Sequence, residues 1–226
     1  MTNKTPTRRL KVKLASNKKR TTSQRAWLER QLNDPYVQQA KSDGYRSRAA
    51  YKLIEIDQKF KILKPGQRVI DLGACPGGWT QVAVERVKSQ TNPKARVIGV
   101  DLTEMAAIAG ATVFQGDFTE EETQTKLIEL LDGKAQVILS DMAAPACGMT
   151  DVDHIRIMVL VEEAFNFAEN ILAPGGAFVA KVLRGGTEAN LLKRLKLAFQ
   201  KVTHFKPPAS RKDSAEMYVI GIGFKG

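Results

Sequence analysis

Short apolar runs alternate along this chain with segments in which apolar residues recur three and four positions apart. Seven of the runs have the length of buried strands, and they cover residues 68–73, 96–102, 111–117, 135–143, 176–182, 201–207 and 216–224. The spacing between most of them predicts helices at 77–88, 120–131, 154–172 and 187–200. Short buried strands separated by amphipathic helices predict a parallel sheet with helices on both faces.

The last two predicted strands are connected differently. A loop of fewer than ten residues, rich in Pro and Ser, joins 201–207 to 216–224. Because this loop is too short for a helical crossover, these two strands should be antiparallel. The pattern therefore predicts an α/β fold with a doubly wound, mostly parallel sheet of seven strands that ends in an antiparallel hairpin.

The first part of the chain has its own organisation. Three further helices are predicted there, at 23–32, 34–44 and 46–60. The first two of these helices open with the capping residues Ser23 and Asp34. Residues 1–22 lack such a pattern and are expected to form a disordered tail. We therefore divide the chain into the tail, 1–22, and a single domain, 23–226, whose N-terminal helices occupy 23–60.

Positive charge is concentrated at the N-terminus. The formal net charge is +11, and residues 1–30 contain ten Lys or Arg and one acid, Glu29. The other 196 residues are nearly balanced, with 25 basic and 23 acidic residues. A mobile polycation attracts nucleic acid by counterion release, although a solvated extension that aids solubility would have the same composition. The tail lacks the aromatic or Leu-rich face of an interfacial membrane helix.

The rest of the composition limits the class of protein. No apolar run approaches the roughly 18 residues that span a bilayer, and the N-terminus lacks the apolar stretch of a secretory signal, although a mitochondrial presequence stays an alternative. Cys75, Cys147 and the two histidines have no partner at metal-ligand spacing. We therefore expect a reduced, cytoplasmic protein without a metal, with both cysteines as small filler residues, and a monomer by default.

A glycine-rich turn follows the first predicted strand in the stretch "DLGACPGGWT", which runs from Asp71 to Thr80. Gly73, Gly77 and Gly78 allow a ligand to approach the backbone closely, and the helix that follows offers unpaired N–H groups. The spacing differs from the G-x-G-x-x-G of dinucleotide dehydrogenases. It fits a turn that holds an adenosine or an amino-acid carboxylate, or simply a tight connection between strand and helix.

Two acidic residues lie at the ends of the next two predicted strands. Asp101 is placed to accept both hydroxyls of a ribose, and Asp117 lies where an adenine amino group would be read. Each of them can instead be a helix cap. Because the carboxyl ends of parallel strands share one edge of the sheet, both acids and the glycine turn are expected to face one ligand site.

Seven segments that follow one another from about Trp27 to the C-terminus resemble the FtsJ-type ribosomal RNA 2′-O-ribose methyltransferases. They are "SRAAYKL", "DLGACPGGWTQVA", "GVDL", "QGDF", "LSDMAAPACG", "AKVLRG" and "PPASRKDSAEMYVIG". The second and the fifth are the most specific to that family, although the fifth has one Ala more than the usual pattern. The resemblance implies a Rossmann-like methyltransferase fold and S-adenosylmethionine as the cofactor.

The same resemblance implies the residues of the site and the substrate. The implied catalytic residues are Lys52, Asp141, Lys181 and Glu216. The implied cofactor contacts are Gly77, Trp79, Asp101, Asp117 and Asp141. The implied reaction is 2′-O-methylation of a uridine ribose in 23S ribosomal RNA of the assembled 50S subunit, so the large ribosomal subunit is the expected partner.

The implied catalytic residues suit a ribose hydroxyl, which is a poor nucleophile without a base. Lys181 is the candidate base, and a lysine acts as a base only in its neutral form, which burial and a neighbouring cation such as Lys52 favour. Asp141 and Glu216 would orient its amino group. Without the resemblance, these four residues would be interpreted as solvated or capping residues, and Trp79 can instead belong to the core.

Other interpretations stay open. The same chemistry can act on another RNA, such as a tRNA anticodon loop or a cap ribose, and the chain can also be a ribosome-assembly factor that binds RNA without catalysis. An NAD-dependent oxidoreductase is disfavoured by the glycine spacing. Arg184 and the loop 210–214, "SRKDS", are candidates for contacts with RNA phosphates, or else part of a solvated surface.

Overall fold

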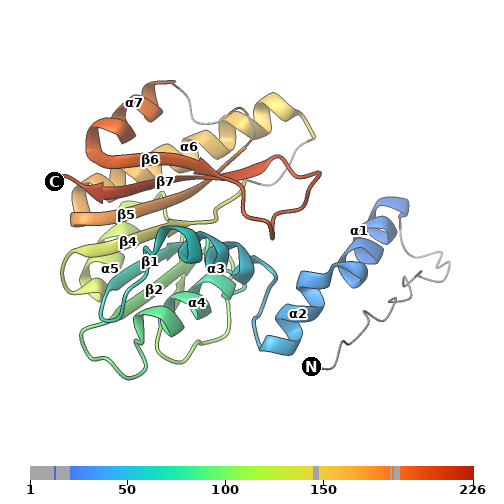
Figure 1. Cartoon of the computed structure of the whole chain (residues 1–226), viewed down its shortest axis with the longest axis horizontal. Helices are drawn as coiled ribbons and strands as arrows, with labels where there is room; N and C mark the ends of the chain where they lie inside the picture. Colours follow the sequence, from blue (N-terminus) through green and yellow to red (C-terminus); the bar gives the residue numbers. More distant parts are fainter. Residues whose placement is uncertain (1–12, 14–20, 145–147, 184, 186–188) are drawn as a thin grey trace, which may run out of the picture.

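The computed structural model describes residue 13 and residues 21–144, 148–183, 185 and 189–226 (Figure 1). The strands in these residues are β1 (Arg68–Leu72), β2 (Arg96–Asp101), β3 (Thr112–Gln115), β4 (Ala135–Ser140), β5 (Leu172–Leu183), β6 (Phe199–Phe205) and β7 (Glu216–Phe224). The helices are α1 (Thr22–Asn33), α2 (Pro35–Asp43), α3 (Ala49–Phe60), α4 (Gly78–Val87), α5 (Glu121–Leu131), α6 (Thr150–Ile171) and α7 (Ala189–Ala198). Each corresponds to a predicted element. Cys147 and Arg184 lie outside the described residues.

The strands form one sheet with the order β3-β2-β1-β4-β5-β7-β6. β1 pairs in parallel with β2 and β4, and the pairs β2–β3 and β4–β5 are parallel as well. β7 is antiparallel to both β5 and β6. This confirms the predicted doubly wound, mostly parallel sheet with an antiparallel C-terminal strand. The sequence pattern does not indicate that β7 inserts between β5 and β6, and this insertion brings the last strand beside β5.

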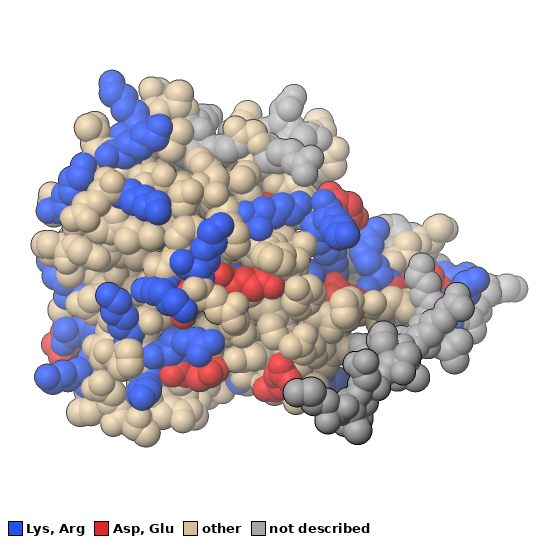
Figure 2. All heavy atoms as spheres, viewed as in Figure 1, with Lys and Arg blue, Asp and Glu red and all other residues tan. Residues whose placement is uncertain are grey.

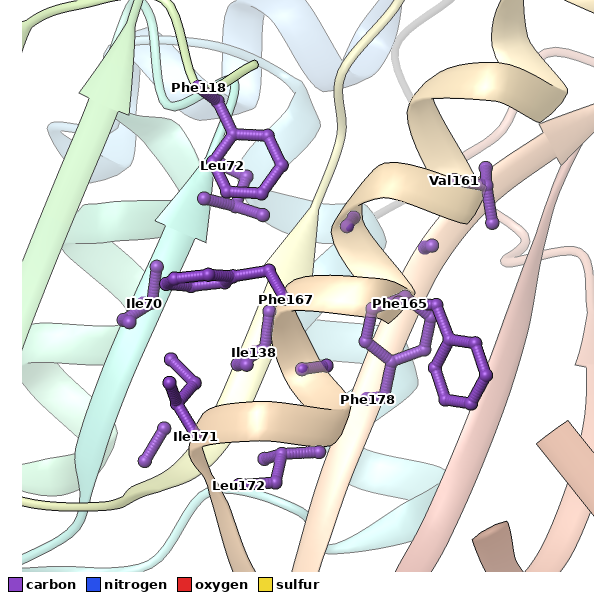
Figure 3. Packing of buried hydrophobic residues seen from close by; sticks show 14 of the residues in the cluster. Ile70, Leu72, Phe118, Ile138, Val161, Phe165, Phe167, Ile171, Leu172 and Phe178 are labelled. Carbon is purple, nitrogen blue, oxygen red and sulfur yellow. The ribbon is translucent and has the colours of Figure 1, made fainter. Parts of the chain in front are cut away.

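Helices cover both faces of the sheet. On one face, α5, α6 and α7 pack against β1, β4 and β5 over a large apolar cluster (Figure 3). Phe165 of α6 and Phe178 of β5 are fully buried there, and their ring centroids are 5.7 Å apart. On the other face, Leu53 and Ile56 of α3 and Val82 of α4 belong to a second buried cluster. Burial of apolar surface in these two layers is the main force that holds the fold together.

The first two helices lie to one side of the sheet (Figure 1). The N-cap of α1 is Thr21, which forms a reciprocal capping box with Gln24. The prediction that Ser23 caps this helix is therefore wrong, because Ser23 already lies within it. Asp34 caps α2 as predicted, since its carboxylate accepts the backbone N–H of Tyr36 at 3.0 Å.

The parallel strands place their carboxyl ends at one edge of the sheet, where ligands of open α/β folds bind. Asp101 is the last residue of β2, Asp141 directly follows β4, and Lys181 lies near the end of β5. The fold thus assembles at this edge residues that are far apart in the sequence. Among the described residues, no helix is both long and apolar enough to cross a membrane.

Candidate active site

The glycine turn between β1 and α4 approaches the segment after β4 very closely. Gly73 has a φ angle of 75°, which favours glycine. A Cβ atom at Gly73 would lie 2.8 Å from Cγ of Met142 and 2.9 Å from its backbone nitrogen. Glycine is therefore required at this position for the turn after β1 and the segment after β4 to meet.

A cavity of about 270 Å³ lies at the carboxyl edge of the sheet beside this turn. Its walls come from the turn, the ends of β2 and β4, the segment after β3 and one residue of α6. The lining residues are Gly73, Cys75, Val100, Asp101, Leu102, Gly116, Asp117, Phe118, Thr119, Asp141, Met142, Ala143 and Leu160. Three acids on an otherwise largely apolar lining are typical of a pocket that holds a flat ring and reads its polar substituents.

Asp101 is held between two loops. One carboxylate oxygen, Oδ2, accepts the backbone N–H of Cys75 at 2.9 Å, and Oδ1 accepts that of Thr103 at 2.8 Å. An irregular segment follows it, so the alternative that Asp101 caps a helix does not apply. Each carboxylate oxygen can accept more than one hydrogen bond, so Asp101 is oriented and still able to accept donors from a ligand.

Asp117 is oriented by its own loop. Its Oδ1 accepts the backbone N–H of Thr119 at 2.9 Å and the Thr119 hydroxyl at 2.7 Å. These hydrogen bonds lower the pKa of the Asp117 carboxyl, so the side chain is ionised at neutral pH. Both predicted nucleoside-reading acids, Asp101 and Asp117, therefore line the cavity as oriented acceptors.

Lys181 and Asp141 form a buried pair at the end of the cavity nearest to β5. The Lys181 ammonium donates to the backbone carbonyl of Asp141 at 2.6 Å and lies 3.2 Å from the carboxylate Oδ1. Only 6% of the Lys181 side chain is exposed. These two contacts to Asp141 fix the position of the Lys181 Nζ at the carboxyl edge of the sheet.

Lys52 and Glu216 form a second pair next to the first. Lys52 extends from α3 and its Nζ lies 3.1 Å from Oε2 of Glu216, the first residue of β7. In the antiparallel pairing of β5 with β7, Lys181 lies opposite Tyr218, two residues beyond Glu216. The structure therefore brings all four predicted catalytic residues together, from α3, β5, β7 and the segment after β4.

Electrostatic effects couple the two pairs. Burial raises the pKa of the Asp141 carboxyl, but the Lys181 and Lys52 ammonium groups outweigh burial and hold that pKa below its ordinary value. Burial likewise raises the pKa of Glu216, and the charges of Lys52 and Lys181 again produce a net lowering. Both carboxylates are therefore ionised at neutral pH, and each feels both cations.

Tyr218 also belongs to this group, although it is not among the residues that the sequence implies for the site. Its hydroxyl donates to Oδ1 of Asp141 at 2.8 Å, and its ring lies 5.8 Å from Nζ of Lys52. Burial, followed by the charge of Asp141, raises the pKa of Tyr218 well above its ordinary value, so it stays a neutral donor. The alternation of side chains along a strand is the signal that could have found it, because Glu216 and Tyr218 share one face of β7.

The structure places two of the predicted cofactor contacts elsewhere. Trp79 is 3% exposed, its indole N–H donates to the carbonyl of Ala49 at 2.8 Å, and its ring packs against Tyr218. Among the described residues, neither Trp79 nor Gly77 lines the cavity. Trp79 thus supports the site from the core, as the alternative interpretation had it, because its ring fills the space between α3, α4 and β7.

Asp71 is a further acid close to the site. It is fully buried on β1, and its Oδ2 accepts the hydroxyl of Thr80 at 2.6 Å. Its Oδ1 has no hydrogen-bond partner among the described residues. Burial, with a contribution from the charges of Asp141 and Asp101, raises the pKa of Asp71 to about 7 against the effect of the Thr80 hydrogen bond.

The order of the strands, the antiparallel β7 and the cavity at the carboxyl edge define the Rossmann-like fold of the methyltransferases. Residues 45–224 match the model of the FtsJ-like methyltransferases, and the chain belongs to this family.

Two curated relatives are both named ribosomal RNA large subunit methyltransferase E. The protein from Parvibaculum lavamentivorans is 57% identical over 225 residues, which cover 97% of this chain and 89% of that protein. The protein from Paramagnetospirillum magneticum is 55% identical over 221 residues, which cover 97% and 90%. A crystal structure from Plasmodium falciparum, described as a ribosomal RNA methyltransferase, has a TM-score of 0.71 and 34% identity, and covers 80% of this chain and 100% of that one.

Proposed function

We propose that this protein uses S-adenosylmethionine to methylate the 2′-oxygen of a uridine ribose in 23S ribosomal RNA within the assembled 50S subunit. One observation carries the proposal. Asp141, the partner of the buried Lys181, lines the same cavity as Asp101 and Asp117. A base and a nucleoside site therefore share one edge of the sheet, as transfer between a bound cofactor and a ribose requires.

The residues of the cavity fit the proposed cofactor. Asp101 offers an oriented carboxylate to the ribose hydroxyls, and Asp117 offers an ionised acceptor to the amino group of the adenine. Leu102 and Phe118 supply apolar surface for the ring. Asp141 lines the same cavity and would face the positively charged end of the ligand. When bound, S-adenosylmethionine supplies an electrophilic methyl group.

Lys181 is the proposed general base. In its neutral form, Nζ would take the proton of the ribose 2′-hydroxyl as that oxygen accepts the methyl group, and the bond from the methyl carbon to sulfur would break to release the cofactor as a neutral thioether. The carbonyl and carboxylate of Asp141 hold Nζ in place, and the Tyr218 hydroxyl holds the carboxylate. Lys52 and Glu216 continue this network toward the surface and would orient the ribose. Alignment of the reacting atoms supplies much of the rate.

The surface next to Glu216 suits an RNA backbone. A pocket of about 280 Å³ is lined there by Arg30, Arg48, Arg211, Asp213, Ser214 and Glu216. Arg48 and Arg211 both contact the carboxylate of Asp34, at 2.8 and 3.4 Å, which holds their guanidinium groups beside this pocket. Figure 2 shows Lys and Arg side chains spread over much of the face of the molecule that it displays. The basic segment before Thr21 would add affinity that depends on salt.

The relatives' names favour the large-subunit RNA over a tRNA or a cap ribose. The same relatives support a place for the protein in the cytoplasm, where ribosomal subunits are assembled in bacteria.

The experiment that tests the proposal is transfer of a labelled methyl group from S-adenosylmethionine to 50S subunits that lack the modification. Label mapped to a 2′-O-methylated uridine of the 23S RNA is the expected result. Free 23S RNA and unmodified tRNA serve as alternative acceptors in parallel reactions. No label in any of them, with cofactor binding demonstrated in the same preparation, would reject catalysis and favour an RNA-binding assembly factor.

A further inference from the structure

Arg46 lies between α2 and α3, outside the cavity, and its side chain reaches two other segments of the chain. Nη1 donates to the carbonyl oxygen of Ala106 at 2.7 Å and to that of Pro76 at 3.3 Å. Nη2 donates to the carbonyl oxygen of Ala107 at 2.6 Å. A single guanidinium therefore joins the glycine turn to the irregular segment 102–111 that connects β2 with β3.

Both of the joined segments form walls of the cavity. Cys75, which precedes Pro76, is one lining residue, and Leu102, at the start of the segment 102–111, is another. Arg46 itself lies behind these walls, in a separate surface pocket. Its position lets it set the separation of the two walls without touching a ligand between them.

The backbone of Arg46 is held by α4. The side chain of Gln81 accepts the N–H of Arg46 at 2.8 Å and donates to the carbonyl of Gly44 at 3.1 Å. The guanidinium thus starts from a fixed point on the helix that follows the glycine turn. A planar fork with several donors suits three carbonyl oxygens better than the single ammonium of a lysine does.

Gly77 leaves the space in which this contact forms. A Cβ atom there would lie 3.2 Å from Cδ and Nη1 of Arg46 and 2.6 Å from Cδ1 of Ile108. Gly77 also has a φ angle of 110°, which side chains rarely adopt. The absence of a side chain at Gly77 therefore lets Arg46 and Ile108 pass over the turn.

The contact made by Arg46 outside the cavity adds to one inside it. Within the cavity, the same two walls are joined by Asp101, whose carboxylate accepts the N–H of Cys75. That carboxylate is also the acceptor for the ribose hydroxyls in the proposed function, so it serves both the wall and the ligand. The donors of Arg46 face backbone carbonyls, and Arg46 does not line the cavity in which the ligand is proposed to bind.

We propose that Arg46 is a positioning residue that holds the two walls of the nucleoside cavity at the separation that the cofactor requires. This inference rests on the proposed cofactor site. We expect Arg46 to affect the affinity for the cofactor, and to affect neither the transfer step nor the binding of RNA.

The experiment compares Arg46→Ala and Arg46→Lys with the unchanged full-length protein. Lys88→Gln is the control, because it removes a cation from the same surface pocket without breaking a contact to either wall. Titration calorimetry with S-adenosylmethionine should show affinity about 10-fold weaker for Arg46→Ala, about 3-fold weaker for Arg46→Lys and unchanged for Lys88→Gln. In methyl transfer, KM for the cofactor should rise while kcat stays within about 2-fold of its normal value.

Hydrogen exchange on the protein without cofactor gives a second measurement. Amides of residues 102–111 should exchange faster in Arg46→Ala than in the unchanged protein and Lys88→Gln. Unchanged cofactor affinity in Arg46→Ala would overturn the inference, and so would weaker RNA affinity with normal cofactor affinity. If the unchanged protein bound no S-adenosylmethionine, the proposed function would fail, and the exchange data would still decide whether Arg46 holds the segment.

Discussion

Asp101 ends β2 and Asp141 directly follows β4, the two strands that flank β1, yet the molecule holds these two carboxylates in different ways. Asp141 is contacted by the charged side chain of Lys181 and the hydroxyl of Tyr218, in a buried network that includes Lys52. Asp101 accepts two backbone N–H groups, from Cys75 and Thr103, in irregular segments. One half of the site is built from buried side chains and the other from loop backbone.

This difference separates two requirements of a transfer reaction. The half of the site formed by β5 and β7 holds the Lys181 amino group in one direction, which rigid strands and buried ion pairs can do. The β1–β3 half has to admit and release a ligand, and loops held by hydrogen bonds can move at small cost. We therefore expect substitutions in the first half to change the rate of transfer and those in the second to change cofactor affinity.

The largest effect is expected at Lys181. Lys181→Met, which keeps most of the side-chain volume, and Lys181→Ala should each lower kcat by about 10³-fold or more, because Lys181 is the proposed base. Cofactor affinity should stay within a few-fold of normal. Labelled methyl transfer and calorimetry measure the two quantities, and thermal melting checks that the unpaired Asp141 has not unfolded the variant. Lys134→Ala is the control, because Lys134 directly precedes β4 and lies at the amino ends of the parallel strands, away from the site. Near-normal turnover in Lys181→Met would refute its role as the base.

The next effect concerns Asp71 on β1, between the two halves. Its pKa is raised to about 7 in the folded protein, so the folded state binds a proton that the unfolded state has released. This contribution to stability is complete below the unfolded pKa of about 4 and is lost as the pH rises through 7. Between pH 5 and pH 8, the unchanged protein should therefore lose about 2–3 kcal/mol of free energy of unfolding through Asp71. Asp71→Asn should not show this loss, so its stability should rise by that amount relative to the unchanged protein. Urea denaturation at both pH values measures it, and parallel pH profiles would contradict it.

A smaller effect is expected at Asp101 and should appear in affinity. Asp101→Asn keeps the shape of the side chain, but its NH2 group replaces a carboxylate oxygen that now accepts a backbone N–H, and the change removes an acceptor proposed for the ribose hydroxyls. The Kd for S-adenosylmethionine should rise by about 30-fold, with kcat at saturating cofactor changed less than about 3-fold. Glu104→Gln, an exposed acid of the same segment, should behave normally. A fall in kcat with normal affinity would erase the distinction between the two halves.

The smallest of these effects is expected for Tyr218→Phe. The ring that packs against Trp79 is kept, and only the hydrogen bond of 2.8 Å to Asp141 is lost. We expect kcat to fall by about 10-fold and cofactor affinity to stay normal, because one neutral hydrogen bond to a charged group is removed. Tyr45→Phe removes a hydrogen bond of the same length to Glu85 at the surface and serves as the control. If both variants were equally active, Tyr218 would have no part in orienting Asp141.

Much of the fold could be predicted from the sequence alone, because it depends on local periodicity. The runs at 68–73 and 96–102 form β1 and β2 because short apolar segments bounded by turns have few alternatives to a buried parallel strand. The short loop before residue 216 determined that the last two strands are antiparallel. The glycine turn and the acids that end the strands indicated a ligand at the carboxyl edge, since parallel strands direct these ends to the same place.

The candidate site was decided in part by the tertiary structure. Lys52 and Glu216 are 164 residues apart, and they meet only because β7 inserts beside β5, under α3. The first residues of a helix can face either the core or the solvent, so the sequence alone leaves the position of Trp79 open. Packing of its ring against Tyr218 places it in the core. The partners of Arg46 are backbone carbonyls, which every residue has, so no sequence pattern indicates these contacts. Local pattern determined the strands and their ends, and long-range packing decided which side chains meet at them.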